Sequence, residues 1–230
     1  CVAGVGPAEL DAIAQQRMAE AGGKPSFLGY RIDDDTIPFP GAVCISINEE
    51  VVHGLPVPNR IIQTGDMVGL DIGMWYEGLA TDMATTVLVG DVHDPKRVAL
   101  VQDTREALVR GLGALKAGGW VHDVGAAVED FIKPKGYGIV KDLVGHGVGH
   151  AVHEEPNVPN YRDTWLPRQR LLDGMVLALE PMIALGTWKV HQKRDGWTIV
   201  TNDSSPCAHF EVTAVVTKDG YELVTPWPDR

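Results

Sequence analysis

The amino-acid sequence predicts a fold of the α+β class, built as a single domain over residues 1–230. Three segments show the apolar spacing of helices, and others are short, apolar and rich in β-branched residues, which is typical of strands. No low-complexity stretch or clear linker divides the chain. Carboxylates lie beside such strands in both halves of the sequence. This faint duplication suggests that two similar halves contribute carboxylates to one central place.

The first helix is predicted over residues 7–21, because Pro7 suits a first helical turn and a Gly pair ends the segment. Its apolar face consists of Leu10, Ile13, Ala14 and Met18. A second helix is predicted to begin at Asp94 and Pro95. Its apolar face consists of Val98, Val101, Leu108, Leu112 and Leu115. A short third helix covers residues 124–132 and ends before a proline.

Strands are predicted over residues 44–48, 67–73, 83–89, 175–179, 197–201 and 210–217. A Tyr-Glu-Gly turn joins the second of these to the third. Asp71 is expected near the end of one strand and Asp82 just before the next. Similarly, Glu180 follows an apolar strand and Glu211 opens the last one.

These carboxylates point to a metal site. A carboxylate embedded in an apolar strand loses hydration free energy unless it is paired or bound to a cation. Each one alone could be an edge residue or half of a buried ion pair. Four in similar settings, with few basic neighbours in sequence, favour a pair of divalent cations instead. Oxygen-rich ligation with one imidazole suits manganese, iron, cobalt or zinc.

Residues 145–156 form the densest cluster of potential ligands, with three histidines and two glutamates among glycines. The His146/His150 and His150/His153 spacings could be read as a zinc-binding helix. That interpretation fails because no His-Glu-x-x-His motif is present and the glycines disfavour a helix. The glycines instead allow the backbone to approach a ligand closely.

Charge and composition exclude several other classes of function. The net charge of −11, from 20 basic and 31 acidic side chains, argues against direct nucleic-acid binding. No apolar run approaches the roughly 18 residues that a membrane helix needs. The three widely spaced cysteines suggest a reducing, cytoplasmic location. Because residue 1 is Cys, the natural start is expected to be missing; a lipid-anchored cysteine is the alternative.

Six motifs, in this order, resemble type I methionine aminopeptidases of the pita-bread metallopeptidase family. The resemblance is carried by residues 44–54 (CISINEEVVHG), 65–71 (GDMVGLD), Thr81-Asp82, 146–156 (HGVGHAVHEEP), 179–182 (LEPM) and Phe210-Glu211. It implies the pita-bread fold, a curved antiparallel sheet with two related αβ halves around a dinuclear site. The implied metal ligands are Asp71, Asp82, His146, Glu180 and Glu211, with Asp82 and Glu211 bridging.

The same resemblance implies the reaction. The chain is expected to remove the initiator methionine from nascent proteins with a small second residue, using water activated by two divalent cations. Glu180 is expected to shuttle a proton, His153 to stabilise the oxyanion and His53 to contact the scissile amide. His150 has no role in the family. The implied methionine pocket consists of Tyr30, Phe39, Cys44 and Trp197, for which plain core packing is the alternative.

The sequence departs from the family pattern between Tyr30 and Cys44, where residues 31–40 form a longer connection. This puts the roles of Tyr30 and Phe39 in question. The three aspartates at 33–35 could favour basic substrates or form a solvated loop. A family helix of roughly 30 residues before the Pro7 helix is also expected to be missing, which would expose apolar surface.

Two other functions fit the same residues. A prolidase or aminopeptidase P shares the fold and the metal site but has a large additional N-terminal domain. A pita-bread binding protein without catalysis would have lost metal ligands, whereas all five are present here. For the aminopeptidase, the expected partners are nascent N-termini and, transiently, the ribosome, and the expected state is a monomer.

Overall fold

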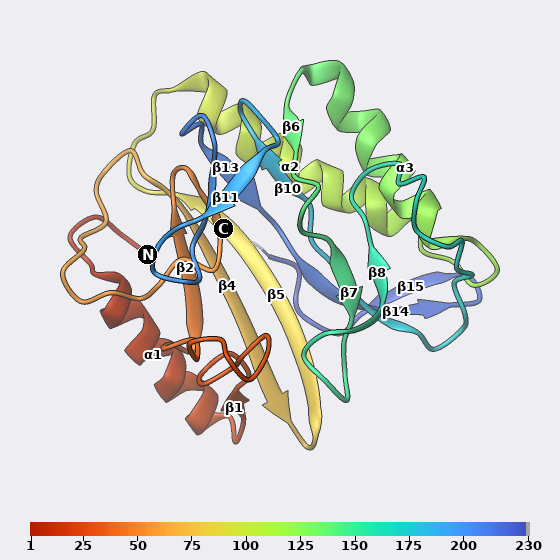
Figure 1. Cartoon of the computed structure of the whole chain (residues 1–230), viewed down its shortest axis with the longest axis horizontal. Coiled ribbons are helices and arrows are strands. Elements are labelled where there is room, and N and C mark those ends of the chain that lie inside the picture. Colours follow the sequence, from red (N-terminus) through yellow and green to blue (C-terminus); the bar gives the residue numbers. More distant parts are fainter. Residues whose placement is uncertain (229–230) are drawn as a thin grey trace.

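The computed structural model describes residues 1–228 and has the expected α+β class. Figure 1 shows a long hairpin, β4 (Met67–Tyr76) and β5 (Leu79–Leu88), through the centre of the molecule. Helix α1 lies on the side of the N-terminal strands, and α2 and α3 lie together at the opposite side. Within residues 1–228, all the paired strands are antiparallel, and no helix is long and apolar enough to cross a membrane.

The first sheet is built on β4. Strands β1 (Lys24–Pro25) and β2 (Val43–Ile47) pair with one edge of β4, and β5 pairs with the other. A two-residue turn joins β4 to β5, and both Glu77 (φ 48°) and Gly78 (φ 86°) have the positive φ angles that such a tight hairpin requires. Both strands are longer than the sequence predicted. Asp71 and Asp82 therefore lie inside strands, not at their ends.

The second large sheet has the order β15-β14-β9-β7-β8. Its strands are β7 (Gly145–Gly147), β8 (Glu154–Val158), β9 (Val176–Leu179), β14 (Val212–Thr217) and β15 (Gly220–Leu223). The two large sheets meet where Glu211 forms an isolated bridge with Ala84 of β5. This bridge brings the carboxylates of the two halves to one place.

Two small sheets complete the strand framework. One contains β13 (Cys207–His209), β10 (Met182–Ala184) and β6 (Gly138–Ile139). The other contains β11 (Val190–Gln192), β12 (Ile199–Thr201) and β3 (Glu50–Val52). The second of these holds the chain before His53 against the hairpin that carries Trp197.

The helices occur where the sequence predicts them, with small differences at their ends. They are α1 (Pro7–Glu20), α2 (Pro95–Gly113) and α3 (Val121–Ile132), followed by a 3-10 turn at Lys133–Lys135. Asp94 caps α2 by accepting a 2.9 Å hydrogen bond from the backbone N–H of Lys96. Helix α3 begins earlier than predicted, and the Asp123 carboxylate accepts from the N–H of Trp120 at its start.

The largest part of the core lies between α2, α3 and the second sheet. Leu108 and Leu112 of α2 pack there with Leu177 of β9 and Val212 of β14, and all four side chains are buried. One prediction about a helix face was wrong: Ile13 of α1 is 48% exposed, so the buried face of that helix is narrower than the sequence indicated.

Candidate active site

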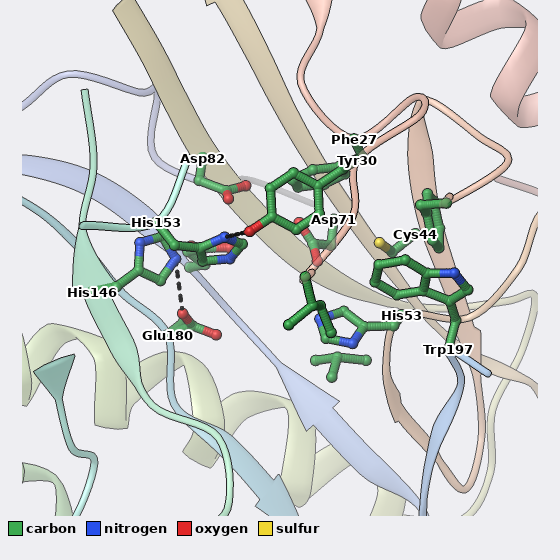
Figure 2. Close-up of a pocket in the computed structure, with 14 residues that line it drawn as sticks. Phe27, Tyr30, Cys44, His53, Asp71, Asp82, His146, His153, Glu180 and Trp197 are labelled. Carbon is green, nitrogen blue, oxygen red and sulfur yellow. Dashed lines mark hydrogen bonds and ion pairs between the residues drawn. The ribbon is translucent and has the colours of Figure 1, made fainter. Parts of the chain in front are cut away.

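One pocket of about 330 Å³ lies between the two halves of the fold. Its lining comprises Phe27, Tyr30, Ile32, Phe39, Cys44, Val52, His53, Asp71, Asp82, His146, His153, Glu180, Trp197 and Glu211. Every site residue that the sequence predicted is in this lining. Figure 2 shows Asp82, His146 and Glu180 on one side of the pocket and Cys44, His53 and Trp197 on the other. The pocket therefore has a carboxylate-rich end and an apolar end.

The antiparallel registers bring the carboxylates together. In the β4–β5 hairpin, Gly73 pairs with Asp82, and Asp71 lies two residues from Gly73, so both aspartates point to the same face. Glu211 joins them because its backbone exchanges hydrogen bonds with Ala84, at 2.9 and 3.2 Å. Glu180 follows β9 directly, in the second half. Four carboxylates that are far apart in the sequence thus share one site.

Burial makes this group of carboxylates unfavourable without a counterion. Asp71, Asp82 and Glu211 are all buried. Burial, together with the charge of Glu180, raises the pKa of Asp71 to about 8. Burial and the neighbouring carboxylates also raise the pKa values of Asp82, Glu180 and Glu211 well above their usual range. Among the described residues, no Lys or Arg lines the pocket to balance these charges.

The donor atoms fit a divalent cation. Ligand atoms of Asp82, His146 and Glu211 lie within 4.8 Å of one another. In addition, Oδ1 of Asp71 and Oδ1 of Asp82 are buried and have no hydrogen-bond partner among residues 1–228. Buried polar atoms normally have partners, so these oxygens indicate a ligand in the site. Oxygen-rich ligation with an imidazole is the donor set that first-row divalent metals accept.

His146 is oriented for ligation by its own strand. Its Nδ1 lies 2.8 Å from the carbonyl oxygen of Gly147, so Nδ1 carries the proton and Nε2 keeps a free electron pair. Nε2 lies 3.4 Å from Oε1 of Glu180. The flanking glycines are needed here: a Cβ on Gly145 would stand 2.4 Å from the carbonyl oxygen of Ala178. The Gly-rich run therefore forms a close strand pair, not a helix.

The apolar end of the pocket is made of aromatic rings in edge-to-face contact. The ring centroids of Phe39 and Trp197 are 5.3 Å apart at 84°, and those of Phe27 and Phe39 are 6.5 Å apart. Trp197 is fixed further because its indole N–H donates to the carbonyl oxygen of Ile37 at 2.8 Å. Cys44 is buried at the base of this end. These side chains line a cavity as well as packing against one another.

The longer connection between Tyr30 and Phe39 leaves both side chains in the pocket. The backbone N–H of Phe39 donates to the carbonyl of Tyr30 at 2.9 Å, which closes the intervening segment into a loop. The aspartates at 33–35 are exposed on this loop. Asp33 accepts hydrogen bonds within the loop, from the N–H of Asp35 and the hydroxyl of Thr36.

Two further histidines border the pocket. His153 receives a contact from Tyr30, whose hydroxyl oxygen lies 2.8 Å from its Nδ1. His53, held at a positive φ of 57°, stands edge-on to Trp197 with ring centroids 6.0 Å apart. Desolvation in the pocket lowers the pKa of each imidazole to about 4, with His146 and His53 contributing for His153, so both are neutral at pH 7. His150 is exposed and lies outside the pocket lining.

One histidine beside the carboxylates was missed by the sequence analysis. His209 is buried, and its Nε2 lies 3.6 Å from Oε2 of Glu180 and 3.9 Å from Oε2 of Glu211. Burial lowers the pKa of His209 to about 3. The signal available in the sequence was its position two residues before Glu211, which places both side chains on the same side of an extended segment.

Comparison with known proteins identifies the fold. The model of metallopeptidase family M24 matches residues 1–218. The methionine aminopeptidase of Borreliella burgdorferi is 43% identical over 97% of this chain and 85% of its own length. A crystal structure of methionine aminopeptidase from Thermotoga maritima superposes with a TM-score of 0.90 at 39% identity, covering 96% of this chain and 86% of that one.

More distant structures share the architecture. The prolidase from Pyrococcus furiosus gives a TM-score of 0.73 at 23% identity, and this chain covers 58% of its length. The antiparallel sheets, the two halves and these neighbours establish the pita-bread fold that the resemblance implied. On the family match and the identity of its relatives, the chain belongs to metallopeptidase family M24.

Proposed function

We propose that this chain is a methionine aminopeptidase that removes the initiator methionine from nascent proteins. The observation that carries the proposal is the convergence of four carboxylates, three of them buried, and His146 beside an apolar aromatic pocket. Curated relatives at 35–45% identity over nearly the whole chain are methionine aminopeptidases, which supports it. As an M24 metallopeptidase, the protein requires divalent metal for its activity.

The metal ligands in this proposal are Asp71, Asp82, His146, Glu180 and Glu211, holding two cations. Asp82 and Glu211 would bridge them, which their central position between the two halves supports. Two divalent ions would compensate the charge of four buried carboxylates and occupy the partnerless oxygens of Asp71 and Asp82. The donor set is compatible with manganese, iron, cobalt or zinc.

Divalent cations held by these residues would activate water for attack on a peptide carbonyl near neutral pH. Glu180 would take the proton from that water and pass it to the leaving amine. His153 would stabilise the developing oxyanion. In this role Nδ1 would accept from the Tyr30 hydroxyl, 2.8 Å away, and the proton on Nε2 would be available for donation. His53 would hydrogen-bond the scissile amide from the opposite wall.

The methionine side chain would occupy the apolar end, between Tyr30, Phe39, Cys44 and Trp197. Aromatic edges and a buried thiol are favourable surroundings for a polarisable thioether. The substrates would be nascent N-termini with a small second residue. The protein would act on them as a monomer in the cytoplasm, during transient contact with the ribosome. The net charge of −11 disfavours direct binding to nucleic acid.

The two rival functions are less well supported. The prolidase and Xaa-Pro aminopeptidase structures are only 20–24% identical, and the chain covers 55–58% of their lengths. Such similarity extends to the fold alone. A binding protein without catalysis would not need all five ligand side chains in one buried cluster, at the free-energy cost that burial imposes on unpaired carboxylates.

Methionine release from a Met-Ala-Ser peptide tests the proposal. The purified protein is chelated and then supplied in turn with manganese, iron, cobalt or zinc, with Met-Pro and Leu-Ala-Ser peptides alongside. We expect metal-restored release from Met-Ala-Ser alone, lost in Glu180→Gln and kept in the exposed control Glu222→Gln. No release with any metal from folded protein would favour the binding protein, and a preference for a proline at the second position would favour the aminopeptidase P alternative.

A further inference from the structure

The imidazole of His209 is buried and polar, and it has no role in the reaction proposed above. Its side chain is 4% exposed, and within the described part of the chain Nε2 has no hydrogen-bond partner. A buried hydrogen-bond donor without a partner costs free energy, so the groups around it indicate its role. The neighbours of this nitrogen are two carboxylate oxygens of the candidate metal site, on Glu180 and Glu211.

The two oxygens of Glu180 face different histidines. Oε1 lies 3.4 Å from Nε2 of His146, and Oε2 lies 3.6 Å from Nε2 of His209. His146 belongs to the compact group of Asp82, His146 and Glu211, whereas His209 lies outside it. One carboxylate oxygen of Glu180 therefore faces the proposed ligand His146, and the other faces His209.

The backbone of His209 is held by the same hydrogen-bond pattern as that of the proposed ligand Asp82. Its N–H donates to Oγ1 of Thr86 at 2.8 Å, and the Thr86 hydroxyl donates back to its carbonyl oxygen at 2.8 Å. The same exchange joins Asp82 to Thr213, at 2.9 and 2.8 Å. His209 and Asp82 thus have equivalent places on either side of the Ala84–Glu211 bridge.

We propose that His209 is a positioning residue for the metal centre, which donates from Nε2 to Oε2 of Glu180. This hydrogen bond would hold the Glu180 carboxylate with Oε1 toward His146 and Oε2 toward His209. As ionised metal ligands, Glu180 and Glu211 can only accept hydrogen bonds, so the proton belongs on Nε2 of His209. Outer partners of this kind orient metal ligands and strengthen metal binding. The inference rests on the proposed function, since it needs Glu180 to be a ligand.

The test is the affinity of the chelated protein for Mn²⁺ alone, measured by isothermal titration calorimetry without peptide. The Met side chain in His209→Met is of similar length but has no hydrogen-bond donor. We expect this variant to bind Mn²⁺ about 10- to 100-fold more weakly. His209→Gln restores an N–H donor, and its affinity should lie much closer to that of the wild type. His150→Met, at the exposed histidine outside the pocket, is the matched control and should bind Mn²⁺ unchanged.

Two results would overturn the role of His209. Wild-type affinity in a folded His209→Met variant would mean that the imidazole does not support the site. Equal losses in the Met and Gln variants would make His209 a direct ligand. If His209→Met does not fold, His209→Asn, whose amide is too short to reach Glu180, gives the same comparison. Wild-type protein that binds Mn²⁺ but releases no methionine would contradict the proposed function and not this inference; a wild type that binds no Mn²⁺ would contradict both.

Discussion

The hydroxyl oxygen of Tyr30 lies 2.8 Å from Nδ1 of His153, although the two residues are 123 positions apart. Their rings are in tilted contact, with centroids 5.3 Å apart (Figure 2). Burial raises the pKa of Tyr30, so its hydroxyl stays protonated and can hydrogen-bond to Nδ1 of His153. The orientation of the His153 ring is therefore fixed by a side chain from the other half of the fold.

Tyr30→Phe removes this hydrogen bond and leaves the ring in place. We expect kcat for Met-Ala-Ser to fall about tenfold, which is the rate equivalent of one hydrogen bond of roughly 1.4 kcal/mol. Mn²⁺ affinity should not change, because the hydroxyl of Tyr30 bonds to His153, which is not a proposed ligand. Steady-state kinetics and calorimetry measure the two quantities. Tyr76→Phe, at the exposed end of β4, is the control. An unchanged kcat would mean that His153 needs no help from Tyr30.

Replacement of either pocket histidine should lower turnover without removing metal. His53→Ala and His153→Ala are each expected to reduce kcat by about 10²-fold, as loss of a single transition-state donor does. The exposed His150→Ala variant should retain full activity. Metal content, measured by atomic absorption on the same samples, separates the two possible roles. Loss of bound metal from either pocket variant would make that histidine a ligand.

The aromatic end of the pocket should determine how well methionine is bound. Phe39→Leu removes the ring that stands edge-on to Trp197 and Phe27 and keeps the position apolar. We expect KM for Met-Ala-Ser to rise about tenfold, with a smaller change in kcat, since contacts of this size typically contribute 1–3 kcal/mol to discrimination. Phe131→Leu, on α3 outside the pocket, is the control. Equal kinetics in both variants would assign Phe39 to core packing alone.

The long elements could be predicted from the sequence because their patterns span many residues. Asp94 and Pro95 mark the start of α2, and apolar runs mark β4 and β9. Short strands such as β6, which has only two residues, contain too little sequence for any period to be visible. These strands form because of the strands with which they pair, and those pairings cannot be read from the sequence.

The carboxylates were recognised, but their positions within the strands were not. Asp71 and Asp82 were expected at strand ends because buried strands usually exclude charge. In the structure β4 and β5 continue past both residues to the Glu77–Gly78 turn, since the site lies against the middle of the hairpin. His209 was missed for a related reason. Its spacing of two residues from Glu211 was a weak signal, and its closeness to Glu180 arises only when β13 pairs with β10.

The metal-free protein should become less stable as the pH rises above neutrality. The pKa of Asp71 is raised to about 8 in the folded state, and its usual value is near 4. Between these values the folded state holds a proton that the unfolded state lacks, so the stabilisation present at low pH is lost as the pH approaches 8. The histidines whose pKa is lowered to about 4 act in the opposite direction, but only below about pH 6.5.

From pH 6.5 to 8.5, the carboxylates therefore dominate. We expect the free energy of unfolding of the chelated protein to fall by up to about 1.4 kcal/mol per pH unit for each proton retained. Urea denaturation at four or five pH values measures this. With saturating Mn²⁺ the decline should disappear, because the cations replace those protons, and in chelated Asp71→Asn it should be shallower, because one titrating group is gone. A flat profile for the chelated wild type would mean that the four carboxylates are already ionised without metal, and that a cation is not needed to hold them together.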